Sequence, residues 1–492
     1  MKTRILTLLL SAVMLLSLFT GCGKDKKADE TTTQAATQNE VIETEENEIS
    51  PEIPAVSYDR TINILQRVGP YKEEWDSDAE KTDVLSDALY TRNQYLKDKY
   101  TIDFAYHNVA IGPDSNIVKA SLLSDMPSYD IMTYSPLFLS SWAQSDLLAQ
   151  IDDLPYVDFA DPWWYGDIME DITVDGSCYF AIGSANLCSL WTANGVLFNK
   201  TMFEQFYPGQ SLYEEVTNKN WTLETMLTYA ENIYADTDGI SGVTADDRYG
   251  IVYAGAVWYP LFYGTGMRLA TKNADGDYVV DLTSENVVNR ITTIVNLCNN
   301  RDITREFNAN DDKDEWFHFA NGNALFLPES IAATNTCRKN MTDDYGVLPT
   351  PLLQAGQANY YAPIHPNHSS AFAIGKNIPQ SDWEMLGAII TDASYMAKKV
   401  QWPALYETVL KGRTAKDNDT LEMLDILYTN LVLDPLLLYD NGNDVDNKIR
   451  ALIADNGATS VYTELYALSE STAQDLMNVV NQLRGQKDSA EG

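Results

Sequence analysis

Histidine, cysteine and basic side chains are scarce in this sequence of 492 residues. It contains 4 histidines and 5 cysteines, and 34 lysines and arginines stand against 71 aspartates and glutamates. The formal charge of −37 excludes a protein that binds nucleic acid through a basic face, because phosphate recognition needs clustered cations. The same charge disfavours an anionic ligand drawn in by a long-range field, although a local arginine could still hold one.

The sequence also lacks the compact motifs of common catalytic sites. It has no G-x-S-x-G, no H-E-x-x-H and no glycine-rich phosphate loop. His365 and His368 could bracket a metal ion, but they enclose a proline, and we interpret them as part of a loop surface. Carboxylates are so numerous that the sequence does not exclude a catalytic pair of the kind that glycosidases use. We predict a protein that is not an enzyme and that needs no cofactor and no metal.

Long hydrophobic runs are absent except at the beginning of the chain. Lys2 and Arg4 precede an apolar run over 5–19, which is shorter than the roughly twenty residues of a membrane-spanning helix. This pattern predicts a signal peptide over 1–21. The run ends in Phe19-Thr20-Gly21-Cys22, which resembles a bacterial lipobox and implies acylation of Cys22. Acyl chains would hold the protein on the extracellular face of the cell membrane; an ordinary secretory signal is the alternative.

Composition divides the rest of the chain. Residues 22–57 carry little aliphatic or aromatic weight, which predicts a lipidated disordered tether. The globular part over 58–485 has about 430 residues, more than one core usually holds, so we expect two lobes. Residues 486–492 are expected to form a disordered tail.

Four cysteines remain after Cys22. The sequence does not decide whether any of them form a disulfide, because sparse cysteines are also found as small buried apolar residues. They are Cys178, Cys188, Cys298 and Cys337.

The stretch Ser177–Lys200 is where we expect the chain to pass from one lobe to the other. Apolar strands are predicted at Cys178–Ile182 and Gly195–Phe198, with small and polar residues between them. Gly183 lies in that connection and permits backbone angles that bulkier residues resist. Such a crossing suits a hinge between two strand-bearing bodies.

Strand and helix patterns alternate on both sides of this crossing. Strand patterns at Thr61–Gln66 and Ile102–Tyr106 enclose a helix pattern at Asp83–Tyr100. A β-α-β series predicts a parallel pair with a right-handed crossover, and ligands of such sheets lie off the carboxyl ends of strands. Later elements are predicted in this order: a helix from Asn220 to Tyr234 capped by Thr222, a hairpin at Lys272–Asp281, a helix from Thr283 to Asn299, a strand at Ala371–Ile374 and a helix opened by a capping box of Ser381 and Glu384.

Several short motifs follow one another along the chain: Tyr129-Asp130-Ile131, Asp146-Leu147-Leu148, Leu197-Phe198-Asn199-Lys200 followed by Phe203, Asn220-Trp221-Thr222, Asn321–Leu325 and Tyr345–Pro351. In this order they resemble the motifs of the extracellular solute-binding proteins of ABC transporters, the carbohydrate-type family 1 that includes maltose-binding protein. The resemblance covers nearly all of 58–485.

The resemblance implies an α/β, two-lobed periplasmic-binding-protein-like (type II) fold. Each lobe would be a mixed, mainly parallel sheet flanked by helices, with a hinge between the lobes. The N-terminal lobe would comprise 58–182 and 360–400, and the C-terminal lobe 183–359 and 401–485. The implied function is capture of a sugar or oligosaccharide between the lobes and its delivery to the permease subunits of an ABC importer, by a monomer. A surface polysaccharide-degrading enzyme, or a glycan-capture protein without a transporter, is the alternative.

Candidate ligand contacts are aromatic side chains beside turns, and polar groups near them. Flat rings offer apolar faces to sugar C–H groups, while Asn, Asp and Glu accept hydrogen bonds from hydroxyls. The candidates are Trp191, Trp258, Tyr259, Glu329, Tyr134, Tyr71, Trp75, Asn194 and Tyr361. The acidic loop 236–250 superficially resembles a calcium loop, but Ile240 stands where an oxygen ligand is required, and a solvated turn is the other interpretation.

Overall fold

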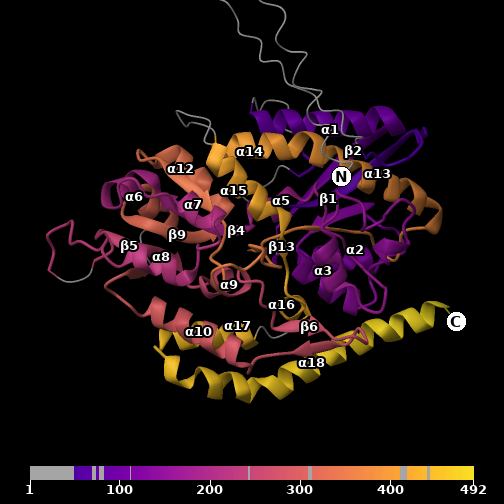
Figure 1. Ribbon diagram of the computed structural model, residues 1–492. Coiled ribbons are helices and arrows are strands. Elements are labelled where there is room, and N and C mark those ends of the chain that lie inside the picture. The colour runs from indigo at the N-terminus through magenta and orange to yellow at the C-terminus, as the bar shows by residue number, and fades with distance from the viewer. Residues whose placement is uncertain are drawn as a thin grey trace, which may run out of the picture. The chain divides into compact units, whose positions relative to one another are not determined.

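The computed structural model describes residues 49–68, 74–76, 83–110, 112–241, 244–307, 313–410, 418–439 and 444–491 (Figure 1). The predicted signal peptide, Cys22, most of the predicted tether and Tyr71 lie outside these ranges. Every helix in the described ranges is too short or too polar to cross a lipid bilayer.

The first sheet has the strand order β12-β3-β1-β2. β1 runs parallel to β2 from the pair Arg60–Ile102 to the pair Val68–Ala110, and it also runs parallel to β3, whereas β12 is antiparallel. The strands are β1 (Arg60–Val68), β2 (Ile102–Ala110), β3 (Ile131–Tyr134) and β12 (Ala371–Ala373). The chain between the sheet strands forms α1 (Val84–Tyr100), α2 (Ser115–Leu122), α3 (Pro136–Gln144) and α4 (Gly166–Ile172), and α13 (Trp383–Met396) follows β12. The predicted β-α-β unit is confirmed.

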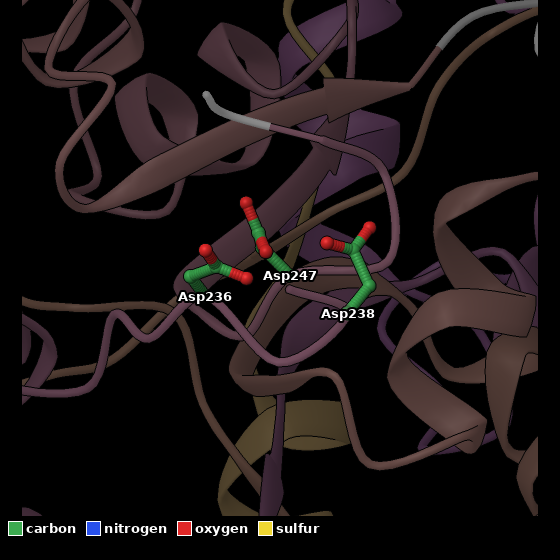
Figure 2. Close-up of side chains that lie close together, drawn as sticks. All are labelled: Asp236, Asp238 and Asp247. Atoms are coloured by element: carbon green, nitrogen blue, oxygen red, sulfur yellow. The ribbon is translucent and has the colours of Figure 1, made fainter. Parts of the chain in front are cut away.

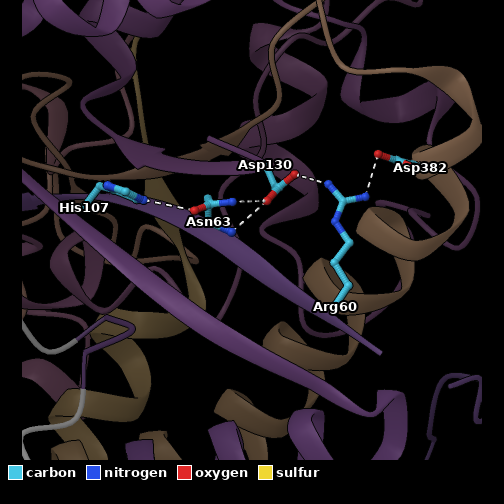
Figure 3. Close-up of polar contacts among 5 residues, drawn as sticks. All are labelled: Arg60, Asn63, His107, Asp130 and Asp382. Atoms are coloured by element: carbon cyan, nitrogen blue, oxygen red, sulfur yellow. Dashed lines mark hydrogen bonds and ion pairs between the residues drawn. The ribbon is translucent and has the colours of Figure 1, made fainter. Parts of the chain in front are cut away.

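A polar network fastens the beginning of this sheet (Figure 3). The Asp130 carboxylate accepts hydrogen bonds from the backbone N–H (2.7 Å) and the side-chain amide (3.0 Å) of Asn63, and it pairs with Arg60 Nη2 at 2.5 Å. Arg60 Nη1 also pairs with Asp382 at 2.7 Å, just before α13, and His107 Nε2 lies 3.1 Å from Asn63 Oδ1. Four chain segments that are distant in sequence are therefore tied at one point.

The second sheet has the order β10-β4-β9-β5-β8. β4 is antiparallel to both of its neighbours, and β5 is parallel to both of its own. The strands are β4 (Asn194–Asn199), β5 (Tyr249–Ala254), β8 (Thr304–Phe307), β9 (Ala324–Ser330) and β10 (Tyr345–Leu348). The helices of this part are α6 (Lys200–Phe206), α7 (Leu212–Thr217), α8 (Leu223–Ala230), α9 (Trp258–Tyr263), α10 (Glu285–Cys298), α11 (Glu315–Ala320), α12 (Thr334–Asn340), α15 (Asn418–Thr429) and α17 (Asp444–Ala454). Thr222 caps α8, as the sequence predicts.

Segments that connect the two sheets pair with one another. Ala181 pairs with Phe372 of β12, and Ala193 pairs with Ile364, so the outward and the returning chain lie side by side. The connecting elements are α5 (Leu187–Trp191), β11 (Ala362–Pro363), α14 (Trp402–Leu410), β13 (Leu431–Val432) and α16 (Pro435–Tyr439), with β11 parallel to β13. A hairpin of β6 (Ala270–Lys272) and β7 (Tyr278–Val280) and the long C-terminal helix α18 (Val461–Glu491) complete the described fold.

Details of the crossing differ from the sequence-based expectation. Residues 178–182 form a single bridge, not a strand, because only Ala181 meets a partner in antiparallel register. Gly183 serves close packing: a Cβ there would lie 2.7 Å from the Trp164 ring.

The predicted capping box of Ser381 and Glu384 is wrong. Glu384 accepts a hydrogen bond from the Tyr156 hydroxyl, and Asp382 precedes α13 without a side-chain cap. The four described cysteines are buried, and no disulfide joins them to one another.

The polar network of Figure 3 predicts a stability effect at Asp130. Asp130→Ala should lower the free energy of unfolding by about 2 kcal/mol, because it leaves the backbone N–H of Asn63 without its acceptor and Arg60 with only one of its two carboxylate partners. Urea denaturation followed by circular dichroism measures the difference. Lys376→Ala is the control: Lys376 pairs with Asp146 at 2.5 Å, but both side chains are about half exposed, so its removal should cost less than about 0.5 kcal/mol. Equal losses in the two variants would contradict the structural role of the network.

Candidate functional site

A cavity of about 450 Å³ lies where the two sheets and the connecting segments meet. It opens off the carboxyl ends of β1, β5 and β9, the position expected for ligands of open α/β sheets. Its lining residues are Arg67, Thr192, Asn194, Ala254, Ala256, Val257, Tyr259, Pro260, Glu315, Trp316, Pro328, Glu329, Ser330, His365, His368 and Arg450. A volume of this size fits a small ligand.

One wall carries two carboxyl groups and a tryptophan. Asp314 caps α11 by accepting from the backbone N–H of Phe317 at 2.9 Å, and this fixes Glu315 and Trp316 in the first turn of the helix. Glu329 lies near the end of β9, and its Oε1 accepts from the backbone N–H of Ser330 at 2.7 Å. Burial, and then the charge of Glu329, raise the pKa of Glu315 to about 7, and burial also raises the pKa of Glu329. The cavity therefore holds two desolvated carboxyl groups.

Guanidinium and imidazole groups also face the cavity. Arg67, at the end of β1, donates from Nη1 to the carbonyl oxygens of His368 (2.6 Å) and Ser369 (3.0 Å). Arg450 on α17 pairs through Nε with Asp446 at 2.8 Å. Burial lowers the pKa of His365 to about 3, with His368 and Arg450 adding to the effect, so His365 is neutral at physiological pH. Two fixed cations and neutral imidazoles thus share the cavity with the two glutamates.

Three of the predicted contacts line this cavity: Asn194, Tyr259 and Glu329. Asn194 donates from Nδ2 to the carbonyl of Pro363 at 2.9 Å, and the Tyr259 hydroxyl donates to the carbonyl of Ile364. Both side chains therefore also hold the returning chain. Their contact with a ligand stays a prediction.

The other predicted contacts that the structure describes do not line the cavity. Trp75 and Tyr134 are fully buried; Trp75 packs against the Arg92 guanidinium at 4.5 Å, and Tyr134 stacks on Trp142. Trp191 is buried in α5, and Trp258 donates from Nε1 to Asp446 at 2.8 Å. Tyr361 is half-buried, with its ring against Gly266.

Arg67, Glu315, Trp316 and Arg450 line the cavity but were not among the predicted contacts. The sequence carries a usable signal for Arg67, because this residue directly follows the predicted strand Thr61–Gln66 and lies two residues before Gly69-Pro70. Glu315, Trp316 and Arg450 lie on helices and have no local pattern that separates them from other surface residues. His365 and His368, interpreted from sequence as a loop surface, also line the cavity.

The acidic loop after α8 gathers three carboxylates (Figure 2). One oxygen each of Asp236, Asp238 and Asp247 lie within 4.8 Å of one another. Asp247 is buried and accepts from the backbone N–H of Thr244 at 2.9 Å, while hydrogen bonds from Thr244 Oγ1 and the Ile240 N–H lower the pKa of Asp238. These bonds account for the turn without an ion. The loop lies apart from the residues of the cavity.

The raised pKa of Glu315 predicts a pH-dependent stability. A carboxyl whose pKa is higher in the folded than in the unfolded chain stabilises the fold while it is protonated, and that contribution disappears as pH rises from about 4.5 through about 7. The unfolding free energy of the wild type should therefore fall relative to Glu315→Gln by about 1–2 kcal/mol between pH 5 and pH 8. Urea titrations at the two pH values test this, with Glu285→Gln as a control at the start of α10. A constant difference between wild type and Glu315→Gln would contradict the shift.

The sequence matches no protein-family model and no curated protein. Solved structures do match. An ABC substrate-binding protein from Listeria monocytogenes, in complex with cycloalternan, is similar with a TM-score of 0.54 and 13% identity, over 86% of this chain and 99% of that one. An ABC transporter solute-binding protein from Thermotoga lettingae, bound with alpha-D-tagatose, has a TM-score of 0.54 and 14% identity over 85% and 100% of the two chains.

The maltose/maltodextrin-binding domain MalE from Bdellovibrio bacteriovorus, bound to maltotriose, is also similar, with a TM-score of 0.50 and 12% identity over 86% and 99% of the chains. At sequence identities this low, the structural similarity establishes a shared fold and no more. The mixed sheets, their flanking helices and the connecting segments described above are thus those of the periplasmic-binding-protein-like fold.

Proposed function

We propose that this protein is a solute-binding protein of an ABC importer that captures a sugar or oligosaccharide in the cavity. The observation that carries the proposal is the cavity itself: one tryptophan, two carboxyl groups and two guanidinium groups converge there from β1, β9, α11 and α17. The similar solved structures named above hold cycloalternan, alpha-D-tagatose and maltotriose, which supports a carbohydrate as the ligand.

A neutral polyol fits the chemistry of this cavity. Sugar hydroxyls can donate to Glu315 and Glu329 and accept from Arg67, so that the desolvated carboxyls gain further hydrogen bonds. The half-buried Trp316 offers a flat apolar face for sugar C–H groups. A ligand that touches both sheets favours a closed arrangement by its differential affinity, and a hinge at the connecting segments would allow opening and closing.

The proposal extends to delivery and anchoring. The closed form would dock on permease subunits, and acylation of Cys22 would keep the protein, a monomer, on the extracellular face of the cell membrane. The lipobox-like sequence before Cys22 supports this anchoring. Cys22→Ser should release the protein from the membrane fraction in a bacterial host, because its acyl chains would be absent; membrane retention equal to the wild type would contradict it.

A polysaccharide-degrading enzyme is the second candidate, and the glutamate pair in the cavity is what favours it. A carboxyl with a raised pKa beside another carboxyl is also what a glycoside hydrolase uses. Incubation with glycans, followed by an assay for new reducing ends, separates the two. Tight binding without new reducing ends supports the solute-binding protein.

A broad glycan panel should contain sugars that raise the melting temperature of the protein. A ligand that binds only the folded state stabilises it by about 2.7 kcal/mol at one hundred times its Kd. Differential scanning fluorimetry measures the shift, with a peptide panel as control. If peptides raise the melting temperature and glycans do not, the ligand is a peptide and the proposal of a sugar is wrong.

Trp316→Ala should weaken binding of the active sugar by about five- to thirtyfold, because loss of a stacking face costs about 1–2 kcal/mol. Trp383→Ala is the matched control. Trp383 is half-buried like Trp316, but it begins α13 and does not line the cavity. Isothermal titration calorimetry with the sugar found in the panel gives both affinities. Equal losses in the two variants would place the sugar outside this cavity.

A further inference from the structure

The C-terminal helix α18 contacts both sheet-bearing parts of the chain. Its beginning packs on α10 and α17, and Lys448 of α17 pairs with Glu464 of α18 at 2.7 Å. Its far end packs on α3, β7 and α16. In Figure 1 the helix, in yellow, runs from beneath α10 and α17 towards the side of α3.

The far end of α18 is fastened by polar side chains. Gln482 and Gln486 donate from Nε2 to the same carbonyl oxygen, that of Gln144 at the end of α3, at 2.7 and 2.9 Å. Arg484, between them, pairs with Asp175 in the turn after α4, and its Nη2 also lies 2.5 Å from Asp277 Oδ1 in the turn of the β6–β7 hairpin. One guanidinium therefore joins three separate segments.

The hairpin reaches the same region. It leaves the second sheet's part of the chain after α9, yet the Tyr278 hydroxyl donates to the carbonyl of Asp171 at 2.6 Å and Lys272 donates to the carbonyl of Glu170. Both carbonyls belong to α4, whose chain continues to Ala181 and so to the edge of the first sheet. The hairpin and α18 thus make a second connection between the two parts, separate from the segments that cross beside the cavity.

Two hollows border this connection. A hollow of about 350 Å³ lies between α4 and the hairpin, lined by Met169, Asp175 and Lys272 among others. Another of about 520 Å³ borders Tyr179, Lys376 and Gln486. Val480 and Leu483 of α18 are buried, so apolar packing accompanies the polar contacts of this junction. The side chains of Arg484 and its two partners are 27% and 41% exposed, so salt can screen their attraction.

We propose that α18 and the β6–β7 hairpin form an interlobe strap, and that Arg484 is its ionic latch. While Arg484 holds Asp175 and Asp277, the strap keeps the two parts together; when the latch opens, the parts can separate at the cavity. The inference rests on the proposed function only for the purpose of that opening, which is entry and release of the ligand. The latch itself is a property of the ligand-free protein.

Small-angle X-ray scattering of the ligand-free full chain tests the strap. Arg484→Gln should increase the radius of gyration by about 1 Å over the roughly 22 Å of a compact body of this size, because the two parts are no longer held. Raising the NaCl concentration from 20 to 500 mM should increase the radius of the wild type and leave that of Arg484→Gln unchanged. Asp175→Asn tests the same latch from the other side, and Asn tolerates the positive φ of 49° at this position.

Lys448→Gln is the matched control. It removes an ion pair of the same helix, with 34% and 40% exposed side chains, but both partners lie on the same side of the connection. It should leave the radius of gyration unchanged. Hydrogen exchange gives the second readout: amides of 270–280 and 475–486 should exchange roughly tenfold faster in Arg484→Gln and not in Lys448→Gln.

Arg484→Gln and Asp175→Asn that match Lys448→Gln in both measurements would overturn the strap. Circular dichroism shows whether each variant is folded, and Arg484→Lys, which keeps the charge, should restore most of the wild-type behaviour. These measurements need no ligand, so they are independent of the glycan panel. A strap without sugar binding would refute the proposed function alone, and sugar binding with an unchanged radius would refute the strap alone.

Discussion

The cavity depends on how Glu74 fastens the two chains that connect the sheets. Its carboxyl group is buried, and Oε1 accepts from the backbone N–H of Cys188 at 2.8 Å, on the outward chain, and from the hydroxyl of Ser370, on the returning chain. The backbone carbonyl oxygen of Glu74 accepts a hydrogen bond from Arg92 Nη2 at 2.6 Å, and this bond ties Glu74 to α1. Burial raises the pKa of Glu74, which is the cost of placing a carboxyl here. In return, both connecting chains are held against the first sheet.

Side chains of the cavity follow from that constraint. Thr192 lies four residues after Cys188, and its hydroxyl donates to the Cys188 carbonyl at 2.7 Å, while His368 lies two residues before Ser370. Arg67 reaches the carbonyl of His368 from the end of β1, so it is held by the same returning chain. The wall formed by the first sheet and the connecting chains is therefore held by hydrogen bonds within the protein. A preformed wall lowers the cost of binding.

The sequence predicts the fold better than the cavity, for physical reasons. The strands at 61–66, 102–106 and 195–198 and the helices after Asp83 and Thr222 depend on local periodicity and caps, and the structure confirms them. Ligand contacts depend on which side chains meet across the fold. Trp75 and Tyr134 carry the same chemistry as Trp316, but they lie beneath the sheet surface, and only tertiary packing decides between these positions.

The aromatic segment α9 shows why abundance of rings is a poor guide to contact. All six of its residues are buried, and the rings of Trp258, Tyr259 and Tyr263 pack on one another with centroids 4.9 to 6.1 Å apart. Only Tyr259 and Pro260 reach the cavity. A cluster so packed has little freedom to move, because displacing one ring would open a void in a dense interior. Its contribution is to hold the wall rigid, and the charged groups that line the cavity, Glu315, Glu329 and Arg67, come from other elements.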